Sequence, residues 1–176
     1  MVRLFSSDYV GAVFDSKRVY RYVLWRLWNR ESPPLITIML NPSTADEEIL
    51  DPTVKKCVKW ARVWGYGGLY VLNAFALRST DPELLAEHVH EGKDPVGPEN
   101  DFHITKALAE HPGARLVVGW GKHATLLNRH QRMIELLAAR ELYCLGINKD
   151  GSPQHPLYIA NATEPKVWRP NLPVKS

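Results

Sequence analysis

The stretch LITIMLNPSTAD, residues 35–46, decides the expected fold, because an apolar, β-branched run ends abruptly in Asn41-Pro42. Such a run is typical of a buried strand that leads into a turn. Three further apolar runs end in the same way: residues 69–72 before Asn73, 116–118 before Gly119-Trp120-Gly121, and 142–145 before the loop that reaches His155. In open α/β sheets, ligands gather outside the carboxyl ends of the strands. The four strand ends therefore predict a single site at one edge of a sheet.

Helical patterns separate these runs. Asp51-Pro52 predicts the start of a helix that Gly65 ends, and further helices are expected at 83–88, 100–109 and 122–139. The alternation predicts an α/β fold: a three-layer sandwich with a central four-stranded, mostly parallel sheet.

The two ends of the chain have patterns of their own. An apolar/polar alternation near the start predicts a β-hairpin at residues 10–28, and residues 164–176 form a proline-rich tail expected to wrap the surface or fray. Residues 1–176 are expected to form a single domain, because their length allows one sizeable core.

Composition narrows the class of protein. The chain is 45% hydrophobic, has two cysteines, and contains no apolar stretch near the roughly 20 residues that span a bilayer. These features predict a soluble, cytoplasmic protein without a disulfide framework, a membrane segment or a cysteine-bound cluster. The acidic run Asp46, Glu47, Glu48, with Asp51, could bind a divalent metal, but is more often a polar turn. No metal or cofactor is therefore expected.

Charge is spread unevenly along the chain. The net charge is +3, yet residues 1–30 carry six Lys or Arg against two acids, and residues 81–101 carry seven acids against Lys93. The segment 115–132 is also basic and has no acid. This asymmetry favours an anionic partner on one face, with an ordinary solvated surface as the open alternative.

Three polar residues at the strand ends are candidates for chemistry. Asn41 offers an amide suited to orienting a water for attack, or else it is a turn residue before proline. Asn73 could read the edge of a planar base, or else it caps its strand. His155 could stabilise a developing anion near neutral pH, or else it is an exposed loop histidine.

A second group of residues is expected to contact phosphate or nucleic acid. Gly119 and Gly121 allow the backbone to approach a ligand closely, and the helix expected at Lys122 would offer its N-terminus to a phosphate. Ser43 and Lys149 complete this predicted group. The spacing matches neither a dinucleotide fingerprint nor a P-loop.

Residues 19–168 resemble a bacterial domain-of-unknown-function family, number 1643, in which LNPSTAD and the Asn73 segment are distinctive. The four strand ends are also similar to motifs of the uracil-DNA glycosylase superfamily. In that resemblance Asn41 positions the hydrolytic water, Asn73 reads the flipped uracil, and His155 stabilises the departing base. Leu40 and Pro42 are expected to bind the base together with Asn73. Met39 or Leu40 replaces the first-motif glycine, and Leu157 replaces the serine after His-Pro.

The resemblance implies a glycosylase-like hydrolase that removes uracil or a modified base from DNA by base flipping. Two alternatives stay open: a domain that binds a nucleotide or nucleic acid without cleaving it, and a hydrolase of free nucleosides or nucleotides. The expected partner is DNA or a nucleotide. The sequence does not identify any protein partner, so protein partners stay unknown.

Overall fold

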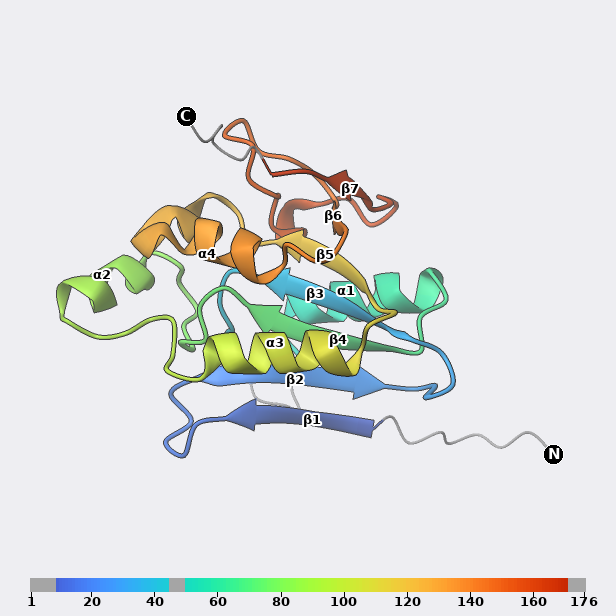
Figure 1. The fold of residues 1–176 in the computed structure, drawn as a ribbon, viewed down its shortest axis with the longest axis horizontal. Coiled ribbons are helices and arrows are strands. Elements are labelled where there is room, and N and C mark those ends of the chain that lie inside the picture. Colours follow the sequence, from blue (N-terminus) through green and yellow to red (C-terminus); the bar gives the residue numbers. More distant parts are fainter. Residues whose placement is uncertain (1–8, 45–49, 171–176) are drawn as a thin grey trace.

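The computed structural model describes residues 9–44 and 50–170, which form an α/β fold around one sheet (Figure 1). The strands are β1 (Tyr9–Phe14), β2 (Arg21–Leu27), β3 (Pro34–Met39), β4 (Gly68–Asn73), β5 (Arg115–Gly119), β6 (Leu142–Cys144) and β7 (Lys166–Trp168). The helices are α1 (Pro52–Val63), α2 (Leu84–His90), α3 (Asn100–Glu110) and α4 (Arg129–Leu136), with 3₁₀ segments η1 (Lys122–Asn128) and η2 (Pro156–Tyr158). The expected α/β class is confirmed.

The sheet is larger than predicted. Its order is β1-β2-β4-β3-β5-β6-β7, so it has seven strands rather than four. Strands β4, β3, β5 and β6 are parallel to one another. The N-terminal hairpin is present and adds β2 antiparallel to β4, while β7 pairs antiparallel with β6. These strands bond to backbone groups that would otherwise lie open along the edges of the parallel strands.

The tail predicted at 164–176 therefore begins as an edge strand instead of wrapping or fraying. Lys166 pairs with Cys144, and Trp168 pairs with Leu142. The ring of Trp168 is buried and meets Trp120 edge-on at a centroid distance of 5.5 Å. This apolar contact explains why the segment joins the sheet. Residues 171–176 lie outside the described part of the chain.

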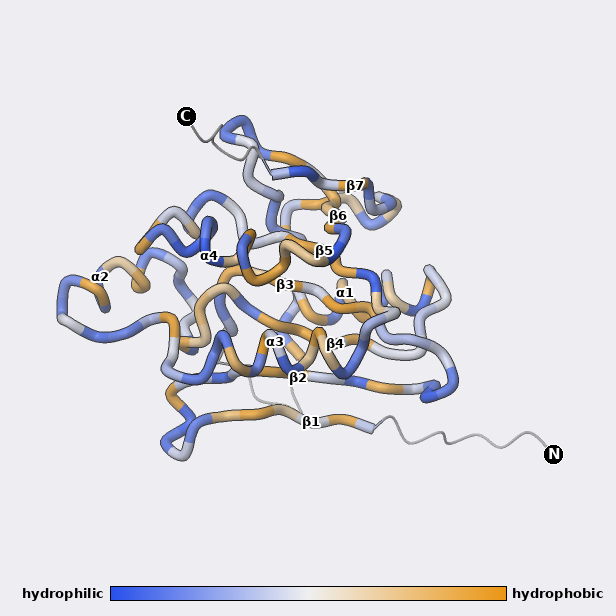
Figure 2. Tube along the Cα trace, in the orientation of Figure 1, coloured by the Kyte–Doolittle hydropathy of each residue, from blue (hydrophilic) through white to orange (hydrophobic). Residues whose placement is uncertain are grey.

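Helices cover both faces of the sheet and make three layers. Apolar residues of α1, such as Val54 and Cys57, pack with Leu35 and Met39 of β3 on one face. On the other face, residues of α3 and α4 pack with Ile36 and Ile38. Figure 2 shows hydrophobic residues concentrated along the central strands and hydrophilic ones along the outer loops near α2.

The start of α1 follows the sequence prediction. The Asp51 carboxylate accepts a hydrogen bond from the Val54 N–H at 2.9 Å, and Pro52 occupies the first turn. Gly65, at φ +80°, lies just beyond the helix. An Asx cap with proline behind it is a local signal, so sequence reasoning could find it.

Two other helix predictions need correction. The helix expected at 122–139 is a 3₁₀ segment followed by α4, because the backbone leaves helical geometry at Leu126 and Leu127. Leu127 and Asn128 have φ values of +53° and +54°, and Leu127 is exposed instead of lying on the apolar face. Asn100 does not cap α3 with its side chain. It is fully buried and bonds to β4.

The register of the central strands sets the site. Met39 at the end of β3 is level with Asn73 at the end of β4 and with Gly119 at the end of β5. Asn41, two residues beyond β3, therefore emerges at the same edge of the sheet as Asn73, although 31 residues lie between them in the sequence. Within the described ranges, no helix is long and apolar enough to cross a membrane.

Candidate functional site

A cavity of about 650 Å³ opens at the carboxyl ends of β3, β4 and β5. Seven of the residues predicted from sequence line it: Leu40, Asn41, Ser43, Asn73, Gly121, Lys122 and His155. Three predicted residues do not line it: Pro42, Gly119 and Lys149. The two asparagines and the histidine come from three separate segments, and the parallel strand ends bring them together.

Asn73 lies deepest among the three candidate chemical groups. Its side chain is only 1% exposed, and its carboxamide Oδ1 is buried without a hydrogen-bond partner among the described residues. A buried carbonyl oxygen without a donor costs free energy. Because Asn73 lines the cavity, a ligand N–H that reached this oxygen would remove that cost.

Asn41 is held by the backbone around it. Its Nδ2 donates to the carbonyl of Pro42 at 3.2 Å and to the carbonyl of Ser79 at 3.0 Å. Both partners are acceptors, so the atom that faces them must be the nitrogen. The carboxamide oxygen of Asn41 is thereby left to accept a hydrogen bond from a water or a ligand.

His155 is neutral at physiological pH. Burial lowers its pKa to about 4, although the negative charge of Asp51 acts in the opposite direction. Its Nδ1 accepts a hydrogen bond from the Leu157 N–H at 3.2 Å, so the ring proton resides on Nε2. His155 therefore presents a neutral N–H donor.

The loop that carries His155 is fastened from both sides. A Cβ at Gly119 would lie 2.8 Å from Cδ of Pro156, so the glycine permits close packing of the loop on β5. From α1, Lys56 Nζ donates to the carbonyls of Leu157 and Ile159, and Trp60 Nε1 donates to the carbonyl of Asn161 at 2.8 Å. The structure therefore shows Gly119 in this packing, and the predicted contact of Gly119 with phosphate stays a prediction.

The rest of the predicted phosphate group is also arranged differently. The Gly121 N–H donates to the carbonyl of Pro153 at 2.9 Å, and the segment that begins at Lys122 is 3₁₀ rather than α-helical. Ser43 Oγ donates to Asp51 at 2.9 Å. Lys149 is exposed and does not line the cavity. The α-helix expected to begin at Lys122 is therefore not formed, while a phosphate contact of Ser43, Gly121 or Lys122, which line the cavity, stays a prediction.

Other residues of the cavity were not predicted as site residues. Asp51, which the sequence predicts as the cap of α1, also lines the cavity, and its negative charge acts to raise the pKa of His155. Trp120, 1% exposed, forms part of the wall, and its place between two glycines after a strand was the available signal. Leu157 and Tyr158, 48% and 74% exposed, are also lining residues.

A second cavity, of about 620 Å³, is lined in part by residues 29–34 and 110–114, beside the amino ends of β3 and β5, and holds none of the predicted residues. In the part of the chain that the structure describes, no group of three His, Cys, Asp or Glu side chains could hold a metal. The acidic residues Asp46, Glu47 and Glu48 lie outside that part.

Comparison with known proteins identifies a family. The model of a family described as protein of unknown function (DUF1643) matches residues 21–157, which span the sheet from β2 to β6 and include Asn41, Asn73 and His155. No curated protein and no solved structure matches the chain.

Proposed function

Because the chain belongs to the DUF1643 family, whose description assigns no activity, we propose its function from the cavity: a hydrolase that removes uracil or a modified base from DNA. One observation carries this proposal. Asn41, Asn73 and His155 line the same cavity and present an acceptor for water, an acceptor for a ligand N–H, and a neutral donor.

Two of these groups suit the edge of a base. The buried Oδ1 of Asn73 lacks a donor among the described residues. His155 is neutral and offers its Nε2–H as a hydrogen-bond donor, without a positive charge that would attract any anion. A base with an N–H beside a carbonyl, such as uracil, supplies a donor to Asn73 and an acceptor to His155. Satisfying a buried carbonyl is favourable by about 1–3 kcal/mol.

The hydrolytic step uses the remaining group. The Asn41 oxygen accepts a hydrogen bond from a water, which directs the water's lone pair at the sugar carbon. As the carbon–oxygen bond forms, the carbon–nitrogen bond breaks and its electron pair leaves with the base, while the proton that the attacking water loses is released to solvent. His155 Nε2–H then donates to the oxygen on which negative charge develops. A base inside a duplex cannot reach such a cavity, so the target nucleotide is flipped out of the stack.

Incubation with labelled oligonucleotides tests this proposal. Uracil-containing single- and double-stranded DNA, and DNA with other altered bases, are incubated with the protein and analysed for abasic product. We expect product that Asn41→Ala and His155→Ala abolish, while His90→Ala, an exposed histidine of α2, serves as the matched control. Absence of abasic product across the panel, from protein with a cooperative melting transition, would contradict the proposal.

A second candidate function is a hydrolase of free nucleosides. It is favoured because the backbone N–H expected to bind phosphate already has a hydrogen-bond partner within the protein. The Gly121 N–H already bonds to Pro153, and a nucleoside needs no phosphate contact there. Salt separates the two functions. Affinity for DNA falls steeply as salt rises, because phosphate contacts release counterions, whereas the KM for a neutral nucleoside stays constant. Binding of either ligand without turnover would instead indicate a non-catalytic domain.

A further inference from the structure

The end of β4 is held in an unusual way. The antiparallel register between β2 and β4 ends at the pair Leu24–Val71. On the other side the ladder with β3 continues beyond the strand, since Ala74 N–H donates to Met39 O and Phe75 N–H to Leu40 O, both at 2.8 Å. The carbonyls of Asn73 and Ala74 are buried here, and buried backbone carbonyls need donors.

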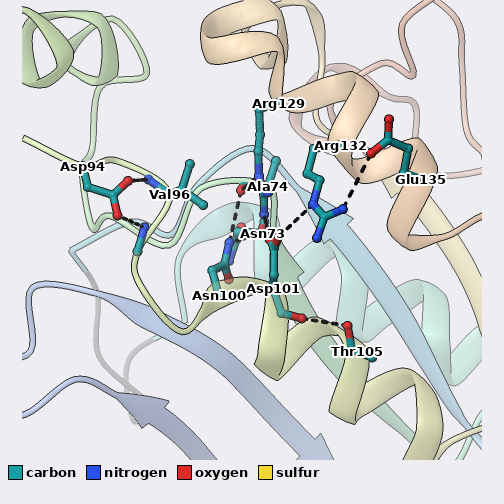
Figure 3. Close-up of polar contacts among 11 residues, drawn as sticks. Asn73, Ala74, Asp94, Val96, Asn100, Asp101, Thr105, Arg129, Arg132 and Glu135 are labelled. Carbon is teal, nitrogen blue, oxygen red and sulfur yellow. Dashed lines mark hydrogen bonds and ion pairs between the residues drawn. The ribbon is translucent and has the colours of Figure 1, made fainter.

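Two side chains from distant helices supply these donors (Figure 3). Asn100, the first residue of α3, donates through Nδ2 to the carbonyl of Asn73 at 3.0 Å and to that of Ala74 at 3.1 Å. Arg129, the first residue of α4, donates through Nε to the carbonyl of Ala74 at 2.6 Å. Asn100 is 0% exposed and Arg129 4% exposed, so both contacts are shielded from water.

The buried guanidinium depends on one carboxylate. Arg129 Nη2 lies 2.6 Å from Asp101 Oδ1, and the exposed Arg132 bonds to the other oxygen of Asp101 at 2.9 Å. Burial disfavours the charged form of Asp101, but the hydrogen bonds from both arginines prevail, and its pKa is lowered. Buried ion pairs are often replaceable by apolar residues without loss of stability. Stability alone is thus a weak reason for Arg129 to be here.

The break before α4 also serves this contact. Leu127 and Asn128 have positive φ angles, a backbone conformation that residues other than glycine adopt infrequently. This break separates η1 from α4 and places Arg129 at the start of the new helix. These two residues with positive φ directly precede Arg129, whose guanidinium group is buried.

We propose that Asn100 and Arg129 are positioning residues that hold the Asn73–Ala74 peptide units and thereby keep the Asn73 carboxamide in place in the cavity wall. This proposal rests on the proposed function only in assigning Asn73 to a ligand. The contacts reach Asn73 through its backbone, and neither Asn100 nor Arg129 lines the cavity. A residue that binds ligand is effective only when its orientation is fixed before the ligand arrives.

Two substitutions loosen this support without removing the fold's apolar contacts. Arg129→Lys keeps the positive charge for Asp101 but cannot also reach the Ala74 carbonyl, and Asn100→Ala removes both of its donated bonds. Arg132→Met is the matched control, because it removes an arginine from the same carboxylate but from an exposed position.

The first measurement needs no ligand. NMR relaxation of the Asn73 amide groups is compared in the wild type and the three variants, with melting curves of each. We expect the Asn73 order parameter to fall from a rigid value to below about 0.6 in Arg129→Lys and in Asn100→Ala, and to stay unchanged in Arg132→Met. An unchanged Asn73 in both folded variants, or failure of both variants to fold, overturns the positioning role.

The second measurement uses free uracil as the probe. We expect the Kd of folded Arg129→Lys and Asn100→Ala to rise by about 10-fold relative to wild type and not beyond that of Asn73→Ala, and that of Arg132→Met to stay within about threefold. Equal affinities across the set overturn the positioning role. A wild-type protein that binds no uracil contradicts the proposed function instead, and the order parameter of Asn73 still decides the inference.

Discussion

Replacing Asn73 by alanine should weaken ligand binding while leaving stability nearly unchanged. The side chain is 1% exposed, and its oxygen has no donor in the described part of the protein. Removing a buried oxygen that bonds to nothing deletes a cost from the folded state, and this offsets the packing lost with the side chain. In the complex, the ligand N–H that would face Oδ1 is left without an acceptor.

The expected change in Kd follows from the contact that the ligand would lose. An unsatisfied buried group costs about 1–3 kcal/mol, which corresponds to a Kd roughly 5- to 150-fold higher. Asn41→Ala is the comparison variant, because its amide donates to the carbonyls of Pro42 and Ser79. That substitution removes the side-chain donor from both carbonyls, although the Pro42 carbonyl still accepts from the Ser79 N–H at 2.9 Å. It should therefore lower Tm, at about 2–4 °C per kcal/mol for a chain of this size.

Calorimetric titration with uracil, together with thermal unfolding of the same preparations, measures both quantities. We expect Asn73→Ala to raise the Kd at least fivefold with Tm within about 2 °C of wild type. The opposite result, unchanged affinity with a clearly lowered Tm, would make Asn73 a structural cap of β4. The proposed base recognition would then lose its main support.

Three further predictions address the loop that carries His155. The pKa of His155 is about 4 in the folded state and 6.5 ordinarily, so between pH 6.5 and pH 4 only the unfolded state takes up a proton. The free energy of unfolding should therefore decline as the pH falls from 6.5 toward 4, and thermal unfolding of His155→Gln should show a smaller decline. Gly119→Ala should lower both Tm and uracil affinity, because its Cβ would lie 2.8 Å from Pro156. Gly121→Ala should lower only Tm, through backbone strain at φ +70°, because no atom lies within 4 Å of its Cβ; equal losses of affinity in the two variants would refute this difference. Lys56→Met should increase hydrogen exchange of residues 157–161, because it removes the hydrogen bonds of Lys56 to the carbonyls of Leu157 and Ile159. Lys55→Met, at an exposed position of the same helix, should not; identical exchange in both variants would show that Lys56 does not hold the loop.

The local elements of this protein are encoded over short stretches of sequence. Apolar runs produced β3, β4 and β5, and Asp51-Pro52 marked the start of α1, because strand burial and helix capping involve residues close in sequence. The same runs placed polar residues at the carboxyl ends of strands, so Asn41 and Asn73 could be selected as candidates. The size of the sheet could not be predicted, since β7 joins through a contact between Trp168 and Trp120.

Tertiary structure alone decided which candidates share the cavity. Parallel pairing levels Met39 with Asn73, and packing of Pro156 on Gly119 brings His155 to them, whereas Lys149 falls outside. The burial of Arg129 was equally invisible, because a basic residue in a polar stretch has the sequence signature of an exposed one. Pairing, loop packing and burial of charge all join residues distant in the chain, and their energies depend on partners that no local pattern specifies.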